Sequence, residues 1–163
     1  MKVFSFVAAS SNSGKTTLIE KIIPFLKERG LRVAVIKHAS AGFDLDRPGK
    51  DSWRFREAGA DAVLLAGPDR LALQKQLEHP ASLEELGAML PDADVLLVEG
   101  FKQNAPNRIE VFRSGVSGER PLCSSDPSFI ALASDRRFEC AIPCFDLNDA
   151  RAIAGFILGK LEL

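Results

Sequence analysis

Four residues in the segment ASSNSGKTT, namely Gly14, Lys15, Thr16 and Thr17, follow one another in the order of a phosphate-binding loop. Backbone N–H groups in a tight loop at the start of a helix donate hydrogen bonds to phosphate oxygens, and a glycine lets the backbone come close. Lys15 would reach the β- and γ-phosphates, Thr16 would place its hydroxyl on Mg²⁺, and Thr17 would contact the α-phosphate. These residue types at this spacing predict a nucleotide site, with Lys15 and Thr16 nearest the reacting phosphate.

The loop departs from the pattern G-x-x-x-x-G-K-[ST] at its first position, where Ala9 replaces the glycine. Alanine is small, so a first position with ordinary backbone angles accepts it at little cost. Asn12 and Ser13 complete the predicted phosphate cradle. An ordinary turn with a solvated Lys15 is the alternative, but a buried strand before the loop and an amphipathic helix after it are the context that the motif requires.

The elements that must position this loop follow from the hydrophobic pattern. Residues 2–8 are short, apolar and rich in Val and Phe, as expected for a buried strand, and apolar residues recur at helical spacing from Leu18 to Leu26. Gly30 ends this predicted helix, and residues 31–38 predict a second buried strand. We therefore expect a βαβ unit with a right-handed crossover and parallel pairing of its two strands.

Later apolar runs extend this arrangement. Two runs joined by residues 67–70 predict a hairpin that adds antiparallel strands to the sheet and makes it mixed. We expect helices over 52–58, 82–90 and 148–163, the last capped by Asn148, and strands over 93–99, 109–113, 128–135 and 142–147. The predicted fold class is α/β: one doubly wound domain over residues 1–163, with a mostly parallel sheet, an antiparallel hairpin and helices on both faces.

Carboxylates after predicted strands supply the metal ligands. Glu99 follows the uncharged run VLLV, so it would emerge at the sheet edge beside the loop and hold Mg²⁺, with a simple surface cap as the alternative. Asp51 lies in the long polar connection ASAGFDLDRPGKDS and is a second metal candidate that would close over the nucleotide. Capping of the following helix is an equally good reading of Asp51.

The base contact is predicted after the run IALA, where Ser134 and Asp135 stand. Loops after the later strands of a doubly wound fold lie near the base, and a carboxylate accepts from the N1–H and N2 amino groups of guanine, a donor pair that adenine lacks. The predicted ligands are therefore GTP and Mg²⁺, with a simple turn residue as the alternative for Asp135.

Composition excludes several other classes. The 163 residues carry a formal net charge of −1, which provides no basic field for nucleic acid, and no apolar run approaches the length that crosses a bilayer. Three cysteines, an odd number, without a signal-peptide pattern at the N-terminus lead us to expect a reducing cytoplasm. Cys140 and Cys144 lack partners for a four-ligand metal set, since the only histidines are His38 and His79.

Taken together, the segments ASSNSGKTTLIEKIIP, VIKHASAGFDLDRPGKDSWRFREAGA, DVLLVEGFK with IEVFR, and IALASD before DLND resemble the adaptor protein B family of molybdopterin-guanine dinucleotide biosynthesis. The resemblance spans nearly the whole chain. It implies a P-loop NTPase fold and a GTP-binding homodimer that is a weak GTPase and acts mainly as an adaptor. The implied partners are the enzyme that attaches GMP to molybdopterin and molybdopterin-bearing proteins. The resemblance also implies phosphate contacts from Gly14, Lys15, Thr16 and Thr17, Mg²⁺ contacts from Asp51 and Glu99, and a guanine contact from Asp135.

Two other functions stay open. A small-molecule kinase or ligase with the same loop would bind its acceptor through Lys37 and the loop GFKQNAP, although no acceptor pocket is evident. A metal-delivery GTPase would need a Cys and His cluster, for which this chain has few ligands. For the adaptor, the loop of residues 101–108, with Lys102 and Arg108, is a candidate contact for a pterin phosphate or partner, and a solvated loop is an equally good reading.

Overall fold

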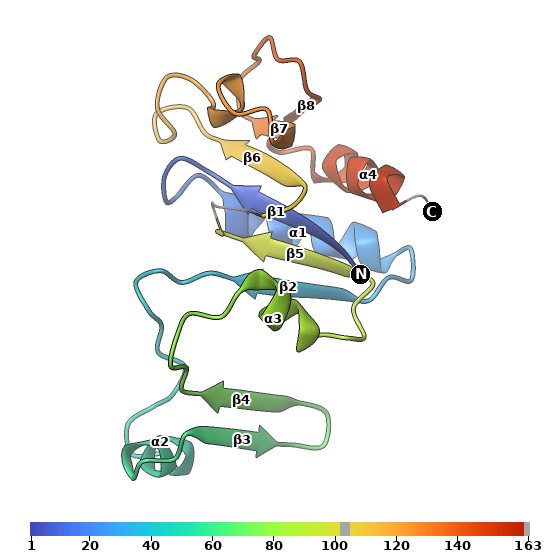
Figure 1. Cartoon of the computed structure of the whole chain (residues 1–163). Helices are drawn as coiled ribbons and strands as arrows, with labels where there is room; N and C mark the ends of the chain where they lie inside the picture. The colour runs from blue at the N-terminus through green and yellow to red at the C-terminus, as the bar shows by residue number, and fades with distance from the viewer. Residues whose placement is uncertain (102–104, 162–163) are drawn as a thin grey trace. The chain divides into compact units, whose positions relative to one another are not determined.

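The computed structural model describes residues 1–101 and 105–161 (Figure 1). The chain forms two compact units, of which the first comprises residues 1–38 and 83–163 and the second residues 39–82. The first unit contains the predicted phosphate loop, Glu99 and Asp135, whereas the second contains Asp51. The two units are described separately.

The first unit is built on a six-stranded sheet in which every pair of neighbouring strands is parallel. In spatial order the strands are β2 (Val33–Lys37), β5 (Val95–Glu99), β1 (Lys2–Val7), β6 (Arg108–Phe112), β7 (Phe129–Ser134) and β8 (Cys144–Asp146). All six strands predicted for this sheet are confirmed. The predicted direct pairing of the first two is wrong, because β5 lies between β1 and β2 and pairs with both.

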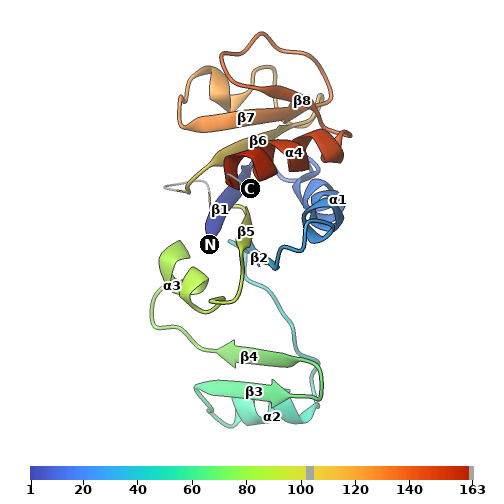
Figure 2. The ribbon, with the colours of Figure 1, turned by 90° about the vertical axis from the view of Figure 1, so that its right-hand side faces the viewer.

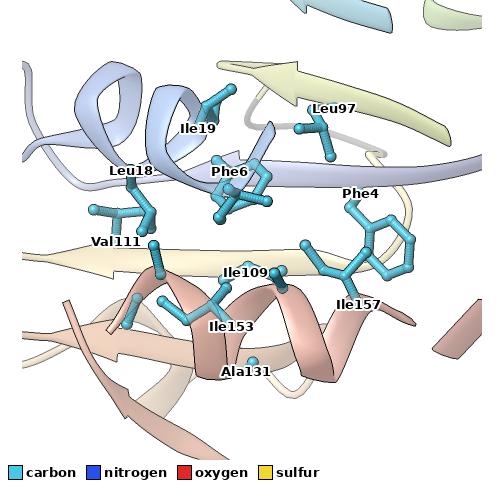
Figure 3. Packing of buried hydrophobic residues seen from close by; sticks show 14 of the residues in the cluster. Phe4, Phe6, Leu18, Ile19, Leu97, Ile109, Val111, Ala131, Ile153 and Ile157 are labelled. Carbon is cyan, nitrogen blue, oxygen red and sulfur yellow. The ribbon is translucent and has the colours of Figure 1, made fainter. Parts of the chain in front are cut away.

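Two helices, α1 (Lys15–Lys27) and α4 (Ala150–Leu161), cover one face of this sheet, as Figure 2 shows. Their apolar sides meet alternate residues of the central strands, and Phe4, Phe6, Leu18, Ile109 and Ile153 are almost completely buried in the resulting core (Figure 3). Burial of such a side chain contributes roughly 1.5–3 kcal/mol. This core therefore anchors the end of β1 and the start of α1, between which the phosphate loop runs.

The opposite face carries the short helix α3 (Leu83–Ala88). Its Gly87 lies against Met1 and Leu96, and a Cβ at this glycine would be 3.3 Å from the Met1 methyl group. A short 3₁₀ turn, η1 (Leu122–Ser124), follows β6 in the chain. The prediction of helices on both faces is confirmed. Among the residues described, no helix combines the length and apolarity that crossing a membrane requires.

The second unit contains α2 (Asp51–Glu57) and the antiparallel hairpin of β3 (Ala62–Ala66) and β4 (Leu71–Lys75). The helix and hairpin were predicted, but the expectation that the hairpin joins the main sheet and makes it mixed is wrong. Strands β3 and β4 pair with each other in a separate two-stranded sheet. A hairpin satisfies its own central hydrogen bonds locally, so its pattern does not reveal whether a larger sheet adopts it.

The start of α4 also differs from the prediction. Asp149, and not Asn148, caps this helix: its Oδ1 accepts a hydrogen bond of 2.9 Å from the backbone N–H of Ala152. The backbone N–H of Asn148 instead donates to the carboxylate of Asp146, at 2.8 Å. Asn and Asp both serve as N-caps, so two such residues in sequence are equally good candidates. The position at which the preceding strand ends decides which of them becomes the cap.

Candidate functional site

The phosphate loop joins the end of β1 to the first residue of α1, Lys15. Gly14 forms the N-cap with φ of 96°, and Asn12 is also left-handed, with φ of 61°. These angles set the turn from which α1 begins, and the N-cap Gly14 supplies no side-chain cap to the helix start. Backbone amides at a helix start, together with the favourable helix dipole, form an anion site.

The side chain of Lys15 lies across this loop. Its Nζ donates to the carbonyl oxygen of Ser10 and to Oγ of Ser13, each at 3.3 Å. Both of these acceptors are neutral, and a phosphate chain bound in the same place would offer the ammonium group stronger, charge-assisted hydrogen bonds. The hydroxyl of Ser10 donates to the carbonyl oxygen of Val116 at 2.8 Å, which ties the loop to the connection after β6.

Gly14 is also closely approached by another side chain. A Cβ at Gly14 would lie 2.9 Å from Nη2 of Arg113, and Nε of this arginine donates to the carbonyl oxygen of Ser13 at 3.4 Å. Glycine is therefore required at this position by backbone angle and by space. Sequence reasoning missed Arg113, because only the pairing of β6 with β1 brings the residue after β6 to the loop.

Thr16 and Glu99 meet at the other side of the loop. The hydroxyl of Thr16 donates to Oε2 of Glu99 at 2.8 Å, and the Glu99 side chain is only 12% exposed. A hydroxyl and a carboxylate are the oxygen ligands that Mg²⁺ takes beside phosphates and water, so these residues fit the predicted metal. The strand-end argument for Glu99 thus agrees with its place beside the loop, while its metal role stays a prediction.

Lys37 joins this pair. It is the last residue of β2 and stands in register with Glu99 on β5. Its Nζ lies 3.4 Å from Oε1 of Glu99 and 3.4 Å from Oγ1 of Thr16. From the sequence alone, Lys37 is a candidate only for the acceptor-binding group of a kinase, because the sequence does not show which strand lies beside β2. The structure instead places its ammonium group on the two predicted metal ligands.

Asp135 follows β7, and its carboxylate is held by Ser114. Oδ1 accepts from the Ser114 backbone N–H and hydroxyl, each at 2.9 Å, and Oδ2 from the same N–H at 3.1 Å. Burial is the largest single influence on the Asp135 pKa and raises it, but the Ser114 hydrogen bonds and the charge of Arg113 together bring that pKa below its ordinary value. The group is therefore an ionised acceptor at neutral pH, as a guanine contact requires.

Two other predicted site residues lie close by. Ser134, the last residue of β7, is buried, and its hydroxyl accepts from the backbone N–H of Arg136 at 3.1 Å. This hydrogen bond stabilises the turn that carries Asp135. Thr17 lies in the first turn of α1 with an exposed side chain. Base and phosphate roles for these residues stay predictions.

Asp51 belongs to the second unit. It is the first residue of α2, while Lys50 is the N-cap, so the reading of Asp51 as the cap itself is wrong. Its carboxylate lies 3.7 Å from Nη1 of Arg54, and its side chain is 83% exposed. An exposed pair of this kind contributes little to stability, which leaves the carboxylate open to other partners. The metal role of Asp51 stays a prediction.

The predicted partner loop is described only in part, since Lys102 lies outside the described residues. Arg108 is engaged internally: its Nη1 donates to Asp126 at 2.6 Å and to Ser128 at 2.5 Å, and its guanidinium stacks on the ring of Phe129. A contact of Arg108 with a partner stays a prediction.

The cysteines form no soft-metal cluster in the described parts of the chain, where no three His, Cys, Asp or Glu side chains gather in a metal-binding group. Burial, together with the neighbouring Glu110 carboxylate, raises the pKa of the Cys123 thiol well above its usual range. Glu110 itself is completely buried and accepts from the backbone N–H groups of Leu122 and Cys123 at 2.7 and 2.8 Å. This cluster therefore holds η1 against the sheet.

A parallel α/β sheet with a phosphate loop between its first strand and first helix is the fold of the P-loop NTPases. The family model of "Molybdopterin guanine dinucleotide synthesis protein B" matches residues 3–135. The chain belongs to this family.

Relatives and solved structures agree with this assignment. The molybdopterin-guanine dinucleotide biosynthesis adapter proteins of Haemophilus influenzae and Escherichia coli are each 39% identical to this chain, over 93% and 95% of it and 85% and 91% of their own lengths. A crystal structure of molybdopterin-guanine biosynthesis protein B superposes with a TM-score of 0.78 at 30% identity, covering 98% of this chain and 99% of the other. Bacillus subtilis MobB, at 24% identity, shares the fold with a TM-score of 0.74.

Proposed function

We propose that this chain is a GTP-binding adapter protein in molybdopterin guanine dinucleotide biosynthesis, where it assists the enzyme that attaches GMP to molybdopterin. Family membership and the names of the 39% identical relatives support the pathway. The observation that carries the nucleotide site is the hydrogen bond of Thr16 to Glu99 at the start of α1, directly after the left-handed Gly14. The proposed cofactors are GTP and Mg²⁺, and the proposed location is the cytoplasm.

The residues of the loop have separate tasks. The amides after Gly14 bind phosphate oxygens, and the ammonium group of Lys15 turns from its loop acceptors to the β- and γ-phosphates. Mg²⁺, held by Thr16 and Glu99, would neutralise the charge that develops between the terminal phosphates. Asp51, on the second unit, is proposed as a further metal ligand.

Hydrolysis at this site is proposed to be slow. The carboxylate next to the loop, Glu99, is occupied by Thr16 and Lys37, so it is poorly placed to take a proton from water. The weak GTPase therefore serves the adapter role and does not turn over substrate rapidly.

The base end of the site is proposed to select guanine. The ionised carboxylate of Asp135 keeps acceptor sites beyond its hydrogen bonds to Ser114, and guanine presents two adjacent donors. Asp135→Asn is expected to reduce the preference for GTP over ATP by about 10-fold or more, because an amide both donates and accepts. An unchanged GTP to ATP affinity ratio would assign the base contact elsewhere.

A homodimer is proposed through the hairpin of the second unit. One face of this two-stranded sheet presents Leu64, Leu71 and Leu73, which are 60%, 71% and 50% exposed and lie together by register. A lone two-stranded sheet is marginally stable in water, and a second copy would cover this face. Light scattering of Leu73→Glu is expected to give a monomer, while Leu45→Glu, at an exposed position of the polar stretch, leaves the dimer intact.

The decisive experiment is isothermal titration of the full chain with GTP, ATP and Zn²⁺ in the presence and absence of Mg²⁺, followed by turnover assays with candidate small-molecule acceptors. The wild type is expected to bind GTP, and Lys15→Ala to lose this binding. Lys21→Ala, which removes an exposed charge from the same helix, is the matched control and should bind as the wild type does. GTP affinity that survives in Lys15→Ala, tight Zn²⁺ binding, or rapid phosphorylation of a small-molecule acceptor would overturn the proposal.

A further inference from the structure

The strand order assigns a direction to a nucleotide bound at this site. Four strands, β5, β1, β6 and β7, are consecutive in the sheet. Glu99 is the last residue of β5, and the phosphate loop, Arg113 and Asp135 follow the ends of β1, β6 and β7. The metal ligands therefore lie at one end of this row of strand ends and the proposed base contact at the other. Phosphates furthest from the base belong near β5, and the α-phosphate belongs near β6.

Arg113 occupies the middle of this row. Its guanidinium lies against the backbone at Gly14, where a Cβ would be only 2.9 Å from Nη2, and its charge acts on Asp135. It therefore lies between the phosphate loop and the proposed base contact. The half-buried side chain is brought there by the pairing of β6 with both β1 and β7.

The hydrogen bonds of Arg113 leave most of its donors unused. Nε donates to the carbonyl oxygen of Ser13 at 3.4 Å, which is long for a hydrogen bond. Within residues 1–101 and 105–161, the Nη groups donate to no side chain or backbone acceptor. Half-buried guanidinium donors bind strongly when an anionic oxygen is supplied, and a phosphate supplies two in the geometry of the guanidinium fork.

The connection after β6 holds this arginine in place. The backbone N–H of Arg113 donates to Oγ of Ser117 at 3.0 Å, and the next residue, Ser114, binds Asp135. Ser10 of the loop binds the same connection at Val116. The backbone that carries Arg113 is thus fixed before any ligand arrives, which lowers the loss of conformational entropy on binding.

We infer that Arg113 binds the α-phosphate of the nucleotide, a role that rests on the proposed GTP site. Support of the loop through Ser13 is the competing explanation. The two differ in one respect: inorganic pyrophosphate has no α-phosphate, and it fits the places of the β- and γ-phosphates beside Lys15. If Arg113 contacts the α-phosphate, replacing it weakens the binding of GDP alone. If Arg113 supports the loop, replacing it weakens the binding of both GDP and pyrophosphate.

The test is isothermal titration of the full chain with GDP and with pyrophosphate, each with Mg²⁺. Arg113→Met is expected to weaken GDP binding by about 10- to 100-fold and to leave pyrophosphate affinity within about twofold of the wild type. Pyrophosphate binding by the variant also shows that its loop is folded. Arg113→Lys should lose less GDP affinity than Arg113→Met, since lysine keeps the positive charge but lacks the two parallel donors of a guanidinium. Arg120→Met, at an exposed position of the same connection, should bind GDP as the wild type does.

Equal losses of GDP and pyrophosphate in Arg113→Met would assign Arg113 to loop support and overturn the inference. Unchanged GDP affinity would overturn it as well. Failure of the wild-type chain to bind GTP or GDP would instead remove the proposed function itself, and with it the ligand that this arginine is inferred to hold.

Discussion

Replacing Gly14 by alanine tests both reasons for a glycine in the phosphate loop. The first reason is the backbone angle: at φ of 96°, a residue with a Cβ costs about 1–2 kcal/mol. For a chain of 163 residues this lowers the Tm by roughly 2–8 °C. The second reason is space, since the new Cβ would lie 2.9 Å from Nη2 of Arg113.

The second reason should affect binding more than stability. The atom that the Cβ meets is the far end of a flexible side chain, so Arg113 can move away at the cost of one long hydrogen bond to Ser13. The displaced guanidinium and the added methyl group then occupy the mouth of the loop. We expect Gly14→Ala to reduce GTP affinity by about 100-fold or more, because close backbone approach to the phosphates is lost.

Gly118→Ala is the matched control. This glycine has φ of 90°, almost the angle of Gly14, but nothing lies within 4 Å of a Cβ built on it. Calorimetry should give similar Tm losses for both variants, while titration with GTP should give normal affinity for Gly118→Ala alone. Wild-type GTP affinity in Gly14→Ala, or an equal loss of affinity in both variants, would refute the close-approach argument.

Three further predictions concern charged side chains. Lys37→Met should increase the affinity of the nucleotide-free chain for Mn²⁺, a spectroscopic substitute for Mg²⁺, because the ammonium group no longer pairs with Glu99. An unchanged or lower Mn²⁺ affinity, measured by electron paramagnetic resonance, would contradict this prediction. Glu110→Gln should lower the free energy of unfolding by about 1–3 kcal/mol, which lowers the Tm by roughly 2–12 °C. The reason is that the backbone N–H groups of η1 bind both carboxylate oxygens, and an amide offers only one oxygen in their place. A smaller calorimetric shift would contradict this prediction. The hydrogen bond from Arg32 lowers the pKa of Asp94 below its ordinary value of 3.8. The ionised carboxylate therefore contributes its full stabilisation above pH 3.8 and loses it as the pH falls toward the lowered pKa. In Asp94→Asn, the free energy of unfolding in urea should depend less on pH within that acid range, and its pH dependence should be unchanged elsewhere.

The sequence by itself determined the local elements and the core of the site. The loop from Ala9 to Thr17 could be identified because its residues act through their own backbone and the helix that follows, all within one short segment. Glu99 could be placed at the sheet edge because a carboxylate that follows a run of buried apolar strand residues lies where the strand reaches solvent. These predictions depend on periodicity and on chemistry that neighbours in the chain supply.

Only the tertiary structure decided which strand ends lie side by side. Strands pair through backbone groups that every residue carries, so the apolar pattern of a buried strand does not specify its neighbours. For this reason the contact of Lys37 with Glu99 and that of Arg113 with Gly14 could not be read from the sequence. The same reason left the hairpin β3–β4 assigned to the wrong sheet, because local pairing satisfies its inner hydrogen bonds in either arrangement.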